Sequence, residues 1–381
     1  MCRPSLTSLA PLRSLVRPRP TEIRSFSSTR LSLSSDKPTA SVPVALIAKI
    51  RSQRPGTPLS LARSALQASN NDLDAALSWI AQQAKETGAK KQEKLASRTA
   101  DQGLVAVAVL ADGTGGTGLR ASLVEMRCET DFVARTDEFR ELVEGVARSL
   151  AFFAEPSPSS PSSGQGLQCL DVKSDSTLDM PVVPSPHQVT EAKSSTTPPS
   201  PETVRTSLAS IVSRLGENIK LHRASSIALE PSLPSSPAPT FLASSYLHAS
   251  KTPTDVASQS GVQSGTLGGL LIAKLSKGGS VEKPEVKNLL RALARQVVAI
   301  PTSSVTASPS APPLQEGEPS TALYDQQLIT MAPSPKFEFE HGSNVGEVLK
   351  KWSQIRGVEG EGLQVTELAR WELGAAEESK E

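Results

Sequence analysis

Four adjacent residues, Thr130, Asp131, Phe132 and Val133, combine side chains that suit contact with another macromolecule. They follow a stretch with strand-like alternation and precede an amphipathic helix, so we expect them at a strand-to-helix turn. An acid beside a large aromatic ring can project from such a turn, the ring to fill an apolar gap and the acid to accept hydrogen bonds. The pattern favours a protein that displaces parts of a partner over one that catalyses bond chemistry.

Spacing alone leaves a second interpretation of Phe132 open. The helix that follows has apolar residues at i, i+3, i+4, i+7 and i+11, namely Phe139, Leu142, Val143, Val146 and Leu150. Phe132 lies seven residues before Phe139, and on one continuous helix it would point to nearly the same face. Core packing and outward projection are both compatible with the sequence.

A glycine motif precedes this turn. Gly113, Gly115 and Gly118 match the pattern G-x-G-x-x-G of dinucleotide-binding proteins. That fingerprint needs a strand before the glycines and a helix after them, so that the helix N-terminus meets the pyrophosphate. Here apolar and charged residues alternate over 124–128, which is the period of a strand. With the apolar run at 104–110, the pattern predicts an antiparallel hairpin with a glycine-rich tip instead of a nucleotide site.

Cysteines and histidines do not predict a metal site or a disulfide framework. The three cysteines stand at positions 2, 128 and 169, and the four histidines at 187, 222, 248 and 341, without the short spacings that zinc sites use. Nor does any apolar run approach the ~20 residues that a membrane-spanning helix needs. We therefore expect no cofactor, no metal and no membrane contact.

Composition indicates that much of the chain is linker. Of 381 residues only 37% are hydrophobic and 3% aromatic, whereas 30 are proline. Segments rich in serine and proline cannot bury enough apolar surface to offset the entropy lost on ordering. We expect a disordered linker over residues 155–203 and disordered insertions near 230–240, 251–263 and 301–320.

Residues 1–35 have the composition typical of a mitochondrial transit peptide. They contain six arginines and one glutamate, a net charge of +5, among many serines and leucines. Their removal would leave a chain of net charge −4, compared with +1 for the whole. A mildly acidic chain is a poor candidate for binding nucleic acid through its phosphates. We expect a protein of the mitochondrial matrix without a direct nucleic-acid partner.

Helical spacing predicts a first folded module over residues 42–88. Two apolar stripes flank a Pro-Gly-Thr-Pro break at 55–58, and a third helix follows Asn71, a residue suited to capping. Three short helices around one core resemble a ubiquitin-associated (UBA) domain. Alone, such a module indicates a docking domain.

Residues 125–134, E-M-R-C-E-T-D-F-V-A, resemble the signature of elongation factor Ts, the nucleotide exchange factor of elongation factor Tu. The G-E-N-I string at 216–219, followed by Arg223, resembles the segment that opens the second half of the family's core. Similar segments also occur at 246–248, 268–271, 296–299 and 365–374. The resemblance covers roughly residues 42–150 and 204–374.

The resemblance implies an α+β fold: an N-terminal three-helix UBA-like module, then a two-part core of antiparallel sheets flanked by helices, with subdomains at 97–154 and 204–376. It implies a guanine nucleotide exchange factor, not an enzyme, whose partner is mitochondrial elongation factor Tu in its GDP-bound and nucleotide-free states. Thr130, Asp131, Phe132 and Val133 would bind this partner and dislocate its Mg²⁺. A UBA-type interaction module without exchange activity is the alternative; it explains residues 42–88 but not the other matches.

Overall fold

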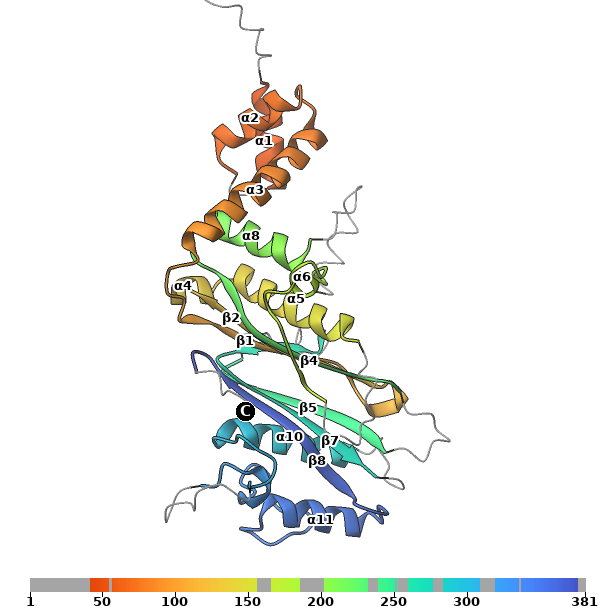
Figure 1. Ribbon diagram of the computed structural model, residues 1–381. Helices are drawn as coiled ribbons and strands as arrows, with labels where there is room; N and C mark the ends of the chain where they lie inside the picture. The colour runs from red at the N-terminus through yellow and green to blue at the C-terminus, as the bar shows by residue number, and fades with distance from the viewer. Residues whose placement is uncertain are drawn as a thin grey trace, which may run out of the picture. The chain divides into compact units, whose positions relative to one another are not determined.

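The computed structural model describes residues 42–54, 57–155, 166–185, 202–231, 239–250, 252, 260–276, 284–308, 319–335 and 337–375. The chain divides into two compact units, Met1–Ala76 and Leu77–Glu381, which are described separately (Figure 1). The predicted transit peptide at 1–35 lies outside the described residues.

The first unit is helical. It contains α1 (Val44–Gln53), α2 (Leu59–Ala68) and the beginning of α3 (Leu73–Leu95). Apolar residues at helical spacing are buried within it: Ile47, Ile50, Ala62, Ala65, Leu66 and Ala76. Both stripes predicted on either side of the 55–58 break therefore form helices with buried apolar faces.

The cap of α3 differs from the prediction. Asp72 accepts hydrogen bonds at its Oδ1 from the backbone N–H groups of Asp74 and Ala75, at 2.9 and 3.1 Å. Asn71, which we expected to cap the helix, has a φ of 66°. A residue in this left-handed conformation turns the chain and leaves the capping position to the next residue, so the Asn71 prediction is wrong.

The second unit is built on two antiparallel sheets, with strand orders β3-β4-β2-β1-β6 and β5-β7-β8. All neighbouring strands pair antiparallel. The strands are β1 (Gln102–Asp112), β2 (Leu119–Cys128), β3 (Gln168–Leu170), β4 (Lys220–Leu229), β5 (Thr240–His248), β6 (Val262–Gly265), β7 (Leu267–Leu275) and β8 (Leu363–Glu372). This confirms the predicted α+β class with antiparallel sheets.

Helices cover the outer face of each sheet (Figure 1). They are α4 (Asp131–Ala134), α5 (Asp137–Phe153), α6 (Asp175–Leu178), α8 (Val204–Leu215), α10 (Pro284–Ala299) and α11 (Val345–Ile355). The helix α5 packs on β1 and β2, and α10 packs on β5 and β7. None of the helices in the described part of the chain has the length and apolar character needed to cross a membrane.

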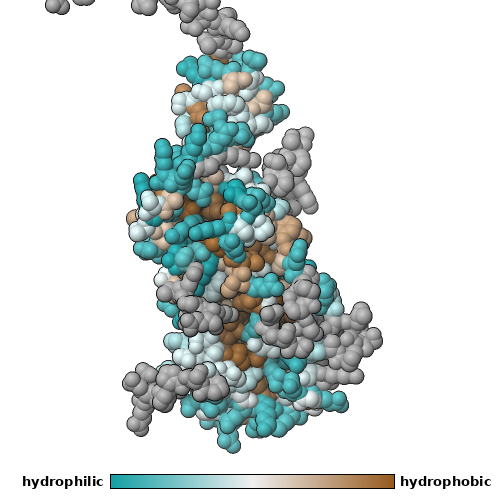
Figure 2. All heavy atoms as spheres, in the orientation of Figure 1, coloured by the Kyte–Doolittle hydropathy of each residue, from teal (hydrophilic) through white to brown (hydrophobic). Residues whose placement is uncertain are grey.

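Three buried clusters hold these layers together. One lies between α5 and the first sheet, one lies between the second sheet and α10 with α11, and one lies between the two sheets. The cluster between the sheets joins Val105, Leu123 and Ile227 to Leu270 and Ile272. On the face seen in Figure 2, hydrophobic atoms are visible along the middle of the second unit, and hydrophilic residues cover the end where α11 lies.

The predicted glycine-tipped hairpin is confirmed. Strands β1 and β2 pair from Gln102 with Cys128 to Asp112 with Leu119. Their connection is a short 3-10 turn, Thr114–Gly116, which begins after Gly113 in a left-handed conformation at a φ of 84°. Since a strand follows the glycines, no helix N-terminus is present to receive a pyrophosphate.

We expected a disordered linker over residues 155–203, but residues 166–185 of this segment are folded. This segment contains β3, which pairs with β4, and α6. Its apolar residues Leu170, Leu178, Met180 and Val182 pack against the α5 core. Sparse apolar residues thus bury enough surface to order a serine-rich segment, which the composition did not indicate. Residues 156–165 and 186–201 lie outside the described part of the chain.

Three further expectations differ from the structure. Strand β6 begins at Val262, inside the second expected insertion. Residues 301–308, in the third expected insertion, are described, and Ser304 forms a β-bridge with Ala322. The expected core boundary at 204 does not separate the sheets, because β4 pairs with β2 and β6 pairs with β1. The two halves of the core sequence are therefore joined in one sheet.

Candidate functional site

The four predicted site residues form a single helical turn between β2 and α5. Thr130 is the N-cap of α4, and its side-chain oxygen accepts a hydrogen bond from the backbone N–H of Val133 at 3.4 Å. Val133, which the resemblance placed among the partner-binding residues, is buried in the core with α5. The turn is thus fixed from below by an apolar side chain and at its start by a cap.

Phe132 projects outward. It is 80% exposed, the highest exposure among the large hydrophobic side chains described, followed by Val44 at 79%. The core-packing interpretation required one continuous helix, but the chain breaks after Ala134, and Thr136 starts α5 by accepting a hydrogen bond from the Phe139 N–H at 3.2 Å. Because the helix is broken, Phe132 and Phe139 do not lie on one helix face despite their seven-residue spacing. Phe132 therefore projects outward.

Asp131 lies beside the ring and is paired with a cation. Its carboxylate contacts the Arg135 guanidinium at 2.8 Å, and both side chains are largely accessible to water. An exposed pair of this kind is weak, on the order of 0.5 kcal/mol, so it exchanges readily for a partner's groups. The turn therefore presents an aromatic ring next to a loosely held carboxylate.

Behind the turn lies the segment that links α8 to β4. Glu217 accepts hydrogen bonds from the Thr130 hydroxyl at 2.6 Å and from the Thr130 N–H at 3.1 Å. In the opposite direction, Glu129 accepts a hydrogen bond from the backbone N–H of Asn218 at 2.7 Å. Two carboxylates, one from each segment, thereby bind the backbone of the other. The T-D-F-V and G-E-N-I strings lie together in space.

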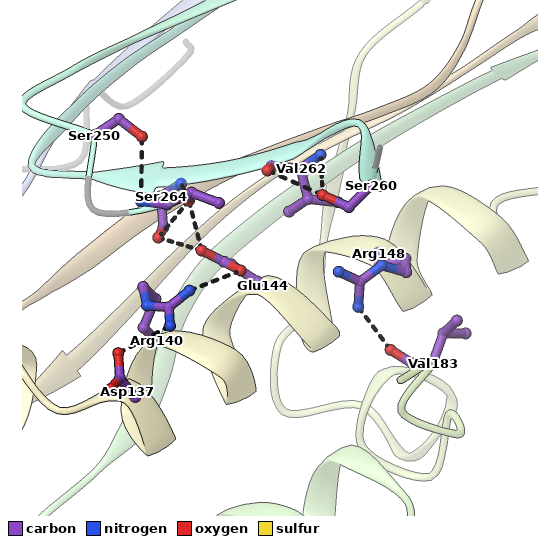
Figure 3. A network of polar contacts seen from close by, with 10 residues as sticks. Asp137, Arg140, Glu144, Arg148, Val183, Ser250, Ser260, Val262 and Ser264 are labelled. Atoms are coloured by element: carbon purple, nitrogen blue, oxygen red, sulfur yellow. Dashed lines mark hydrogen bonds and ion pairs between the residues drawn. The ribbon is translucent and has the colours of Figure 1, made fainter. Parts of the chain in front are cut away.

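The helix that follows the turn is anchored by a buried carboxylate (Figure 3). Glu144, on the buried side of α5, accepts hydrogen bonds from the hydroxyls of Thr252 and Ser264 at 2.6 and 2.7 Å. Arg140 lies 3.6 Å from the same carboxylate. Because Ser264 belongs to β6, these bonds tie α5 to the edge of the first sheet. The turn is therefore held between a fixed strand and a fixed helix.

Cys128 ends β2 directly beneath the turn, and its thiol donates a hydrogen bond to the Thr130 carbonyl at 3.2 Å. Burial raises the pKa of this thiol to about 12, and the nearby negative charge of Glu217 adds to the effect. The group stays protonated at neutral pH and is a packed side chain, not a nucleophile.

The arrangement of the turn suits contact with a partner. Across the described ranges, no three or more His, Cys, Asp and Glu side chains are placed to hold a metal ion. What the turn offers is an exposed aromatic ring that can enter an apolar gap and a carboxylate that can accept hydrogen bonds.

Sequence reasoning did not assign a role to Glu217 or Asn218. Both belong to the G-E-N-I string at 216–219, which was noted for its resemblance alone. Their link to Thr130 and Glu129 spans 87 to 89 residues of chain. No local periodicity carries that information, so the only available signal was the joint occurrence of the two strings.

Comparison with known proteins identifies the family. No protein-family model matches the chain. Mitochondrial elongation factor Ts of Coprinopsis cinerea is 35% identical over 349 residues, which cover 88% of this chain and 92% of that protein. The protein of the same name from Mycosarcoma maydis is 31% identical, with coverage of 92% and 88%. That from Cryptococcus neoformans var. neoformans is also 31% identical, with coverage of 99% and 98%. Relatives that align along nearly the whole chain at these identities show that it belongs to the mitochondrial elongation factor Ts family.

Proposed function

We propose that this protein is the guanine nucleotide exchange factor of mitochondrial elongation factor Tu and promotes release of GDP during translation elongation in mitochondria. Membership of the elongation factor Ts family supports this activity. The observation that carries the site assignment is the 80% exposure of Phe132 on a turn secured at both ends.

The proposed mechanism is a physical displacement of parts of elongation factor Tu. Elongation factor Tu holds GDP together with a Mg²⁺ ion, whose octahedral shell depends on the position of nearby protein groups. Phe132 enters an apolar gap beside the helices that support that metal site, and Asp131 exchanges Arg135 for donors of the displaced elements. Moving the supports weakens the hold on Mg²⁺ and then on GDP. The factor makes and breaks no covalent bond and carries no cofactor.

Linkage fixes how the partner states must behave. A factor that weakens GDP binding to elongation factor Tu must itself be bound less tightly by the GDP form, by the same factor. Its strongest complex is therefore with the nucleotide-free partner. Added GDP dissociates that complex, and this property distinguishes an exchange factor from a passive binder.

The experiment is GDP release from mitochondrial elongation factor Tu loaded with fluorescent GDP. The exposed part of Phe132 corresponds to roughly 160 Å² on a phenylalanine that can bury about 200 Å². At about 25 cal/mol per Å², and with the alanine retaining part of the contact, Phe132→Ala loses up to about 3 kcal/mol, or about 100-fold in rate.

The matched control is Phe152→Ala. Phe152 is 56% exposed and lies near the other end of α5, far along the helix from the turn. We expect this variant to retain the wild-type rate. Undiminished exchange by a folded Phe132→Ala protein would refute the assignment of Phe132.

The remaining parts of the chain complete the proposal. Residues 1–35 act as a transit peptide that directs the protein to the matrix, a role supported by their arginine-rich composition. Residues 42–88 form a UBA-like docking module, supported by the buried helical stripes of α1 and α2. The core subdomains at 97–154 and 204–376 act as one body. A UBA-type module without exchange activity is not favoured, because relatives match 88% to 99% of the chain.

A further inference from the structure

We infer that Glu217 is a positioning residue of the exchange site: it holds the turn that presents Phe132 without contacting the partner itself. This inference rests on the proposed function of the turn. Glu217 lies between α8 and β4, 87 residues after Thr130 in sequence, and it uses both carboxylate oxygens on that one residue.

The geometry is bidentate. Oε1 of Glu217 accepts from the Thr130 hydroxyl at 2.6 Å, and Oε2 accepts from the Thr130 backbone N–H at 3.1 Å. Hydrogen bonds to an ionised carboxylate are stronger than neutral ones. Because the hydroxyl proton points to Glu217, a lone pair on the same oxygen remains for the N–H of Val133. One carboxylate therefore fixes both the backbone and the rotamer of the cap.

The turn needs this support because it is short. The helix α4 has four residues, and its own backbone bonds include Ala134 N–H to the Thr130 carbonyl at 3.3 Å and Arg135 N–H to the Asp131 carbonyl at 3.1 Å. A single turn fixes many dihedral angles for few hydrogen bonds and is unstable alone. Phe132 contributes little to its stability, since the ring is exposed. The direction of the ring thus depends on how firmly the cap is held.

Glu217 is itself well placed to act as a fixed point. Gly216 ends α8 in a left-handed conformation, with a φ of 74°, so the chain turns sharply toward β4. Asn218, the residue after Glu217, is buried, and its side-chain amide donates a hydrogen bond to the Arg98 carbonyl at 2.7 Å. Its backbone N–H binds Glu129. Contacts on both sides of Glu217 therefore keep its carboxylate in register with Thr130.

The test compares Glu217→Gln with Thr130→Val and with the double variant. Thr130→Val removes the hydroxyl that binds Oε1, and Glu217→Gln removes the charge and one of the two acceptor oxygens. Each change weakens the same contact, so each should slow GDP release from mitochondrial elongation factor Tu about tenfold at saturating factor. The double variant should lose less than the product of the two single losses, because both changes act on the same contact. Thr130→Ser, which keeps the hydroxyl, should retain more activity than Thr130→Val.

The matched control is Glu359→Gln, which makes the same charge change at an exposed position near the C-terminal strand. It should leave the exchange rate unchanged. A second readout uses the free factor: amide hydrogen exchange of residues 129–134 should accelerate about tenfold in Glu217→Gln. The thermal unfolding midpoint should stay close to that of the wild type, which a general structural role for Glu217 would not allow.

Several outcomes would overturn the inference: wild-type release by Glu217→Gln, an equal loss in Glu359→Gln, multiplied losses in the double variant, or unaltered amide exchange at the turn. A wild-type protein that fails to release GDP would instead refute the proposed function. In that case the amide-exchange measurement, which needs no partner, still decides whether Glu217 holds the turn.

Discussion

Glu125 offers the sharpest test of how the two sheets are held together near the site. This residue of β2 has a fully buried carboxylate, which contacts Arg127 Nε at 2.6 Å and Arg223 Nε of β4 at 2.7 Å. It also accepts a hydrogen bond from the backbone N–H of Gly374, just beyond β8. Arg223 in turn stacks on Trp371 at 4.4 Å. A single carboxylate therefore links the first sheet to the end of the second.

Replacement by glutamine, Glu125→Gln, keeps the shape and removes the charge. The change leaves two guanidiniums with side-chain exposures of only 12% and 15% without their anion. Removing one partner of a buried ion pair costs about 3–5 kcal/mol. Since both guanidiniums keep some contact with water, we expect the lower end, about 3 kcal/mol, from a total stability of about 5–15 kcal/mol.

Urea unfolding followed by tryptophan fluorescence measures this loss, because Trp371 lies in the affected cluster. The control is Glu361→Gln, which breaks the pair with Lys274 at 2.9 Å, where Glu361 is 62% exposed. That change should cost less than about 1 kcal/mol. A loss for Glu125→Gln no greater than that of Glu361→Gln would refute the reasoning.

Two further predictions concern packing and ionisation. A Cβ at Gly269 would lie 2.8 Å from a Val298 methyl, so Gly269→Ala should destabilise the protein by about 1–3 kcal/mol in chemical denaturation. The control is Gly346→Ala, which should not destabilise the protein, because the atoms nearest to the added Cβ lie at 3.5 Å. Equal effects at both glycines would contradict this close packing of β7 on α10. The pKa of Cys128, raised to about 12, keeps the folded thiol protonated, so its contribution to stability is complete below the ordinary thiol pKa of about 8.5 and is lost as the pH rises toward 12. At pH 9, iodoacetamide should label the exposed Cys169 and spare Cys128, and rapid native labelling of Cys128 would show the burial argument to be wrong.

Local patterns were sufficient for the elements nearest the site. Alternation over 124–128 and the apolar positions of 139–150 depend on neighbouring residues, and the structure places β2 and α5 there. The ordered segment 166–185 was not predicted, because its stability comes from distant groups. Glu367 of β8, 200 residues away, accepts a hydrogen bond from the Leu167 N–H at 2.6 Å. Composition cannot reveal such a contact.

The candidate site, like the fold, could be predicted only in part from local patterns. The sequence located Phe132 at a turn but could not choose between core and surface, because a seven-residue spacing fits a continuous helix equally well. The choice is made by Thr136, whose hydroxyl donates to the Val133 carbonyl at 2.8 Å and whose side chain also caps α5. A threonine inside an apparently helical stretch was the available signal for that break.

The exposure of Phe132 and the polar bonds around Thr130 have one energetic consequence. A ring that is already exposed loses no internal packing when it enters a partner, so most of its burial free energy remains available to drive the displacement. A turn that is already fixed by Glu217 and Thr136 loses little conformational entropy on binding. A flexible turn would lose conformational entropy on binding, and part of the same burial free energy would only offset that loss. In the proposed mechanism the T-D-F-V and G-E-N-I strings work as a single unit, in which the first supplies the wedge and the second supplies its rigidity.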